Sequence, residues 1–310
     1  MNTSSLSQVQ WRLAQLGAHI VVALVALVVV GGSTRVMEAG LACPDWPLCF
    51  GSLLPGRQMN VQVFLEWFHR LDAFMVGIAL VFQLLMAVIW RAELPRWLPL
   101  VYSLLVLFVV FRGALGALTV FNLLQSGVVT AHLALALTLV AVMSGLTQRL
   151  LAPNSLPSPL WWRLMSGGCL MAVLAQCLLG GRMATTWAVE RCLNQGESCQ
   201  WLNLHRLSAM PVAFCLLLFV ITSLLVSDWS RSQWRFLLAV FLLVATQISL
   251  GVLTVQFGLQ QPLFTVAHQL VATLLVACLA ALSCRRLPVS QVSMPSTSII
   301  EEPLFEPCHG

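Results

Sequence analysis

Eight long apolar stretches constrain the fold of this chain more than any other feature. Soluble globular domains carry about 25% charged residues, whereas this 310-residue chain is 9% charged and 59% hydrophobic. A stretch of about 20 apolar residues is long enough to cross a bilayer as a helix. The stretches are residues 14–33, 65–90, 97–120, 128–148, 164–181, 202–227, 236–255 and 263–283. We therefore predict an all-α polytopic membrane protein with eight transmembrane helices.

The arginines predict the orientation of these helices, because cytoplasmic loops carry an excess of basic residues. All 16 basic residues are arginine. One side of the predicted bundle holds Arg12, Arg91, Arg96, Arg149, Arg163, Arg231, Arg235, Arg285 and Arg286, and the other holds Arg35, Arg57, Arg182 and Arg191. We therefore expect both termini in the cytoplasm. The net charge of +5 then reflects topology and needs no nucleic-acid partner.

The N-terminus indicates where the protein resides. The first apolar stretch ends without a small-residue cleavage site, so we expect a retained helix and not a signal peptide. The segment before it has no transit-peptide pattern. The expected location is a bacterial cytoplasmic (inner) membrane.

Four histidines inside the apolar stretches form two equally spaced pairs. His69 and His132 are 63 residues apart, and His205 and His268 repeat that spacing 136 residues later. The repeat includes neighbouring residues: His69-Arg70-Leu71 matches His205-Arg206-Leu207, and Leu115-Gly116 matches Leu250-Gly251. Such self-similarity indicates a duplicated structural unit. We expect Gly31-Gly32 and Gly180-Gly181 to end the first helix of each unit. We predict two pseudo-symmetric four-helix bundles, residues 1–150 and 151–285, followed by a disordered cytoplasmic tail at 286–310.

The paired histidines suggest haem. A neutral imidazole is an axial ligand of haem iron, and two facing helices of a bundle can hold the macrocycle between them. The adjacent Arg70 and Arg206 are placed to pair with haem propionates, although each could instead extend to the lipid headgroups. Glycines 113, 116 and 251 are expected to leave room for a flat ring. A lone membrane histidine can also serve only as a hydrogen-bonding partner, but four in register favour haem.

Glu66 distinguishes the two predicted units. It precedes His69 by three residues and so shares its helix face, while the matching position of the second unit is Leu202. A carboxyl group near a haem in low dielectric can accept a proton during oxidation of a ring substituent. We therefore assign chemistry to the first unit and electron transfer to the second. The alternative is a glutamate that is simply hydrated at the interface.

Four of the ten cysteines lie in predicted outer loops. Cys43 and Cys49 share the first such loop, and Cys192 and Cys199 share the corresponding loop of the second unit. Disulfides persist in that compartment, and the spacings do not match a zinc or thioredoxin-like motif. We predict two intraloop disulfides that brace the loops over the outer mouths of the haem pockets. A redox or haem-delivery role for Cys43 and Cys49 stays open.

Several of these motifs together resemble the haem A synthase family. They are the run Gly31-Gly32-Ser33-Thr34-Arg35, the run Gly40-Leu41-Ala42-Cys43-Pro44-Asp45-Trp46-Pro47-Leu48-Cys49, and Glu66 ahead of His69-Arg70. The resemblance covers roughly residues 10–285. It implies a haem b cofactor between His205 and His268, and substrate haem O at His69 and His132, with Glu66 as the catalytic carboxylate.

The resemblance also implies an activity and partners. The reaction would be stepwise oxidation of the C8 methyl of haem O to the formyl group of haem A. Transient partners would be a haem O synthase and a terminal oxidase under assembly, all in a lipid membrane; a homo-oligomer stays open. Two other classes of protein would use the same histidines: a dihaem b-type cytochrome for electron transfer, and a haem transporter or chaperone. Glu66 favours the synthase over both.

Overall fold

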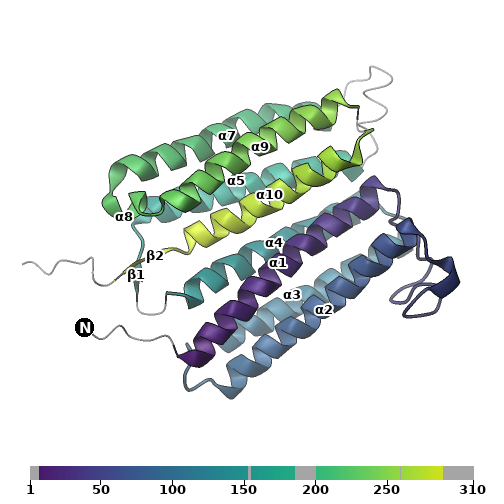
Figure 1. Ribbon diagram of the computed structural model, residues 1–310, viewed down its shortest axis with the longest axis horizontal. Coiled ribbons are helices and arrows are strands. Elements are labelled where there is room, and N and C mark those ends of the chain that lie inside the picture. Colours follow the sequence, from purple (N-terminus) through teal and green to yellow (C-terminus); the bar gives the residue numbers. More distant parts are fainter. Residues whose placement is uncertain (1–6, 153–154, 186–199, 259, 289–310) are drawn as a thin grey trace, which may run out of the picture.

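Eight long helices dominate the structure, a computed structural model that describes residues 7–152, 155–185, 200–258 and 260–288 (Figure 1). They are α1 (Gln8–Val36), α2 (Val61–Ile89), α3 (Leu98–Phe121), α4 (Ser126–Leu150), α5 (Leu160–Thr185), α7 (Gln200–Val226), α9 (Trp234–Gln256) and α10 (Pro262–Ser283). Each is long and apolar enough to cross a membrane. The prediction of an all-α, multi-pass membrane protein is confirmed.

The short elements lie between or after these helices. They are a 3-10 turn η1 (Gly56–Gln58), a one-turn helix α8 (Asp228–Arg231), and the strands β1 (Ser155–Pro157) and β2 (Arg286–Pro288), which pair antiparallel. Arg286 also donates from its guanidinium to the Ser155 carbonyl at 2.7 Å. Residues 286–288, assigned from the sequence to a disordered tail, therefore form a strand.

Helices α1 and α2 begin before the apolar stretches predicted for them, and a polar side chain caps each start. The Ser7 hydroxyl accepts from the Gln10 N–H at 3.1 Å, and the Asn60 side chain accepts from the Val63 N–H at 2.9 Å. Such caps satisfy backbone donors that the first turn leaves free. Proline occupies the first turn of α3 and α10, where its missing N–H costs nothing.

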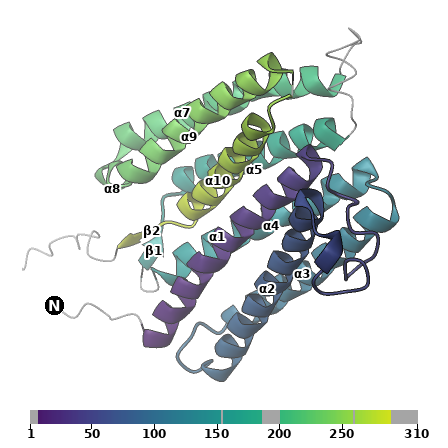
Figure 2. The ribbon, with the colours of Figure 1, turned by 45° about the vertical axis from the view of Figure 1, so that its right-hand side comes forward.

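The helix contacts follow the same order in both halves of the chain. In the first half α1 packs on α2, α2 on α3, α3 on α4, and α4 closes on α1. In the second half the order is α5, α7, α9 and α10, with α10 closing on α5. Helices α1, α4, α5 and α10 make the contacts between the halves, and both ribbon views show the halves side by side (Figures 1 and 2). A rotational relation between them, and the domain boundaries near 150 and 285, stay predictions.

Buried polar side chains tie the helices together. The Gln83 amide donates to the Leu13 carbonyl at 3.2 Å, joining α2 to α1. The Ser144 hydroxyl donates to the Ala277 carbonyl at 2.7 Å, joining α4 to α10 across the halves. Because lipid tails are as apolar as leucine, helices in a membrane associate through close packing and such bonds. These contacts hold the helices in register around the candidate site.

Candidate functional site

Each of the four histidines packs its ring against a glycine of the preceding long helix. A Cβ added to Gly31 would lie 2.8 Å from His69 Cε1, and one added to Gly180 would lie 3.0 Å from His205 Cε1. The matching distances are 3.4 Å from Gly116 to His132 and 3.1 Å from Gly251 to His268. Real side-chain carbons rarely approach that closely, so only glycine lets the imidazole reach the neighbouring backbone.

This contact corrects two expectations. Gly116 and Gly251 do not open space for a flat ring, because histidines already fill it; of the three glycines only Gly113 has nothing within 4 Å of its added Cβ. Gly31 and Gly180 also lie inside α1 and α5, whose last residues are Val36 and Thr185. Their role is therefore to receive a ring and not to end a helix.

The residue four positions before each glycine also faces the histidine, because positions i and i+4 share a helix face. These residues are Leu27, Arg112, Gln176 and Gln247, each with its backbone beside the imidazole. The His268 Nδ1 lies 3.1 Å from the Gln247 carbonyl oxygen. A backbone carbonyl at Nδ1 fixes the tautomer that leaves Nε2 free to bind a metal.

In the first half the rings of His69 and His132 face one another. The ring centroids of His69 and His132 are 6.4 Å apart with planes at 66°. Nδ1 of each ring is buried and lacks a hydrogen-bond partner. Orphaned buried nitrogens are unusual and call for a specific explanation. Two neutral imidazoles that face each other between apolar helices fit the axial positions of a haem.

In the second half glutamine amides bind both histidines. Gln176 Nε2 lies 3.2 Å from His205 Nδ1 and donates to the His205 carbonyl at 2.7 Å, while the Ser208 hydroxyl donates to Gln176 Oε1 at 2.6 Å. Gln247 Nε2 lies 3.1 Å from His268 Nε2. His205 and His268 are close enough to interact electrostatically. The donor set fits a second haem, provided that the Gln247 amide moves off His268 Nε2 and the Gln176 amide, which donates toward His205 Nδ1, moves off that ring so that its Nε2 can bind the iron.

Within the described residues there is no group of three or more histidine, cysteine or carboxylate side chains that could hold a metal ion. Each histidine pair supplies two ligands. A metal bound there needs its remaining ligands from a non-protein group, as the iron of a porphyrin has.

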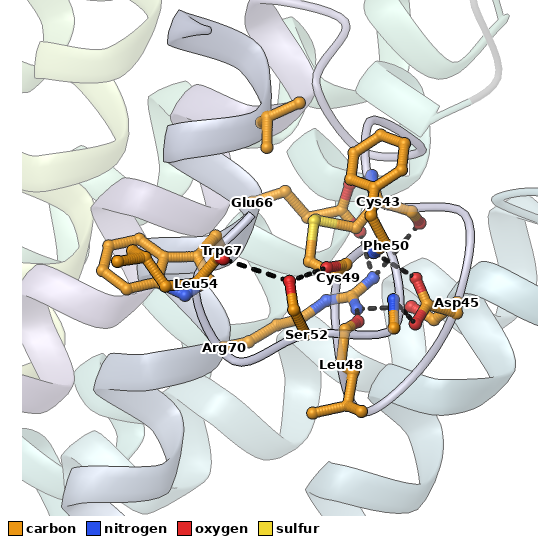
Figure 3. The surroundings of a disulfide bond; sticks show 12 residues. Cys43, Asp45, Leu48, Cys49, Phe50, Ser52, Leu54, Glu66, Trp67 and Arg70 are labelled. Atoms are coloured by element: carbon orange, nitrogen blue, oxygen red, sulfur yellow. Dashed lines mark hydrogen bonds and ion pairs between the residues drawn. A yellow bond between two sulfur atoms is a disulfide. The ribbon is translucent and has the colours of Figure 1, made fainter. Parts of the chain in front are cut away.

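Glu66 and Arg70 of α2 extend toward Cys43, Asp45 and Leu48 in the loop of residues 37–60, as Figure 3 shows. Glu66 is 5% exposed; its Oε1 accepts from Arg70 Nη2 at 2.5 Å and its Oε2 from the Cys43 N–H at 2.8 Å. Arg70 also donates to the carbonyl oxygens of Asp45 and Leu48. The helix therefore anchors the loop through one buried ion pair, and both oxygens of the carboxylate are in use.

A disulfide closes this loop. Cys43 and Cys49 are joined, with Cα atoms 4.8 Å apart, which confirms the predicted pairing. The predicted Cys192–Cys199 bond lies outside the described residues. Asp45 accepts from the N–H groups of Gly51 and Phe50, and these bonds, Gly51 first, lower the pKa of its carboxyl. The disulfide and the ionised Asp45 side chain thus together hold the segment from Cys43 to Gly51 in place.

Sequence reasoning placed some of these residues and missed others. His69 and His132 come together as expected, and Glu66 lies one turn from His69. Arg206 is exposed on α7, unlike the half-buried Arg70. Arg112, Gln176 and Gln247 were missed. An arginine inside an apolar stretch is costly and signals a function, so Arg112 could have been found from its position alone.

These observations define a class: a multi-pass helical membrane protein whose two halves each bury a histidine pair suited to a porphyrin. The chain belongs to the COX15-CtaA family of cytochrome oxidase assembly proteins, whose profile matches residues 14–280.

Curated relatives carry a single name. A heme A synthase of Bradyrhizobium diazoefficiens is 28% identical over 99% of this chain and 100% of its own length. A heme A synthase of Halalkalibacterium halodurans is 26% identical over 83% of this chain and 91% of its length. A heme A synthase of Shewanella oneidensis is 29% identical over 54% of this chain and 55% of its length.

Proposed function

We propose that this protein is a haem A synthase, which oxidises the C8 methyl of haem O to the formyl group of haem A. The family and the names of its relatives support the activity. The observation that carries the proposal is the asymmetry between two otherwise matching histidine pairs: only the first has a buried carboxylate one turn away.

The first half is the proposed substrate half. His69 and His132 would hold haem O, since their rings face each other and their Nδ1 atoms have no other partner. Glu66 would accept the proton released when the methyl group is oxidised. Arg70 and the Cys43 N–H each donate to one of its oxygens, and each oxygen keeps a second lone pair that can take a proton.

The second half is the proposed electron-transfer half. His205 and His268 would hold haem b, which when bound supplies a one-electron carrier. Gln176 would hold the backbone of His205 in place through its bond to the His205 carbonyl. Gln247 must turn its amide away from His268 Nε2 while its carbonyl oxygen continues to face Nδ1.

The proposed setting follows from topology. The multi-pass chain would lie in a bacterial inner membrane with both termini cytoplasmic and all four histidines toward the outer face. Haem O synthase would supply the substrate and an oxidase under assembly would take the product, both by transient contact within the lipid.

Extraction and chromatography of the bound haems test this proposal. The parent protein should yield haem b together with haem O, a hydroxylated intermediate or haem A, and a Glu66→Ala variant should accumulate haem O. Glu93→Ala, an exposed position in the α2–α3 connection, is the matched control and should behave as the parent. Two equivalents of haem b in every protein, with no modified haem, would instead indicate an electron-carrying cytochrome. Bound haem without any modified product would indicate a transporter or chaperone.

A further inference from the structure

The two histidine pairs differ in the charge of the residues around them. The register Leu115-Gly116 with Leu250-Gly251 places Arg112 of α3 opposite Gln247 of α9. The first half therefore has a cation at a position where the second half has a neutral amide. The spacing of 136 residues likewise sets Asp72 against Ser208.

Arg112 is buried and incompletely paired. It is 6% exposed, and its Nε has no hydrogen-bond partner. The ion pairs among the described residues are Glu66–Arg70 and Asp228–Arg231, so Arg112 makes none within 4.0 Å there. A guanidinium stays charged in proteins, and burying one without a tight counter-ion is expensive. A buried cation of this kind inside a membrane helix therefore indicates a functional role.

The position of Arg112 directs its charge at the histidines. It lies one helical turn before Gly116, the glycine that receives His132. Its charge acts on both His132 and His69. Asp72 interacts electrostatically with Arg112 but makes no ion pair with it within 4.0 Å. The rings of the first pair therefore lie in a positive field, whereas glutamines bind those of the second.

We propose that Arg112 is a positioning residue that raises the reduction potential of a haem iron held between His69 and His132 above that of an iron held by His205 and His268. The inference rests on the proposed function, which places a haem at each pair. Reduction removes one positive charge from the iron, so a nearby fixed cation favours the ferrous state. Low dielectric strengthens this effect. The two sites of one fold thereby differ in reduction potential through the charge at one matched position of the repeat.

Spectroelectrochemical titration of the full chain loaded with haem b tests the proposal. A His268→Ala background leaves the first pair as the bis-histidine site. There Arg112→Gln, which copies the second half, should shift the ferric-to-ferrous ratio at fixed potential by at least tenfold toward ferric, a fall of about 59 mV for one electron. Arg112→Lys keeps the charge and should restore most of the parent potential. If Arg112 had only a structural role, Arg112→Gln and Arg112→Lys would have similar reduction potentials.

The reciprocal change gives an independent result. A His132→Ala background leaves the second pair as the bis-histidine site. There Gln247→Arg should raise the reduction potential of the haem. This variant tests the effect of the charge even if the Arg112→Gln protein does not bind haem. An unchanged or raised potential in Arg112→Gln, or an unchanged potential in Gln247→Arg, would overturn the inference. Adding His69→Ala to the His268→Ala protein tests whether haem binds at the first pair. If this double variant keeps a bis-histidine haem spectrum, haem is not held by His69, and the haem site assigned to the first half under the proposed function is wrong.

Discussion

Replacing Gly180 with alanine tests whether the glycine contact sets the position of His205. The added methyl would lie 3.0 Å from His205 Cε1, whereas relaxed carbon contacts are about 3.5–4.0 Å. The ring must therefore retreat or tilt. Overpacking of this kind costs about 1–3 kcal/mol, and each 1.4 kcal/mol is a factor of ten in affinity. If the strain falls on the ligated state, haem b should bind roughly 5- to 140-fold more weakly.

The matched control is Gly168→Ala on the same helix, where an added Cβ meets nothing within 4 Å. Alanine is the better helix former by about 0.5–1 kcal/mol, so this variant should be neutral or slightly more stable. Haem titration by absorbance gives the affinities, and circular dichroism shows that both variants keep their helices. Equal haem affinity of the two variants would refute the idea that Gly180 fixes the ring.

Three further predictions follow from the loop and the helix contacts. Changing Cys43 and Cys49 together to serine should speed trypsin cleavage after Arg57 several-fold, because the loop loses its covalent closure; an unchanged rate would mean that the ion pair beneath it suffices. The pKa of Asp45 is lowered in the folded loop, so its stabilising effect is full above about pH 4 and is lost as the pH falls through the folded value; hydrogen exchange of residues 37–60, corrected for intrinsic rates, should rise only in that acidic range. Gln83→Leu should lower stability in detergent by about 1–2 kcal/mol, since the amide is fully buried and bonds the backbone of α1; a thermal midpoint equal to that of the parent would contradict this.

The membrane explains why so much of the fold can be predicted. In lipid, helices must satisfy all their own backbone groups, so an apolar stretch of the right length has one structural solution. The bounds were less accurate because Ser7 and Asn60 extend α1 and α2 by capping, and hydropathy is insensitive to caps.

The site was only half predictable, for a geometric reason. The histidine repeat and the first disulfide are visible as spacings in the sequence. Gly31 was misread because glycine commonly ends helices, and nothing in the linear pattern shows that an imidazole occupies the space of its missing side chain. The bonds of Gln176 and Gln247 depend on which helices are neighbours, and that information exists only once the chain has folded.

The short pairing of β1 with β2 has a mechanical consequence. It ties the connection between the halves to the end of α10, and beside it Gly145 of α4 is packed so closely on Cys284 that an added Cβ would lie 2.8 Å from the sulfur. The opposite end, where the histidines lie, is also joined. There the Gln269 amide of α10 donates to the Val28 carbonyl of α1 at 2.8 Å, and Arg182 of α5 donates to the Ser126 hydroxyl of α4 at 2.8 Å. The halves are therefore connected near both ends of the bundle, which opposes a hinge motion between them.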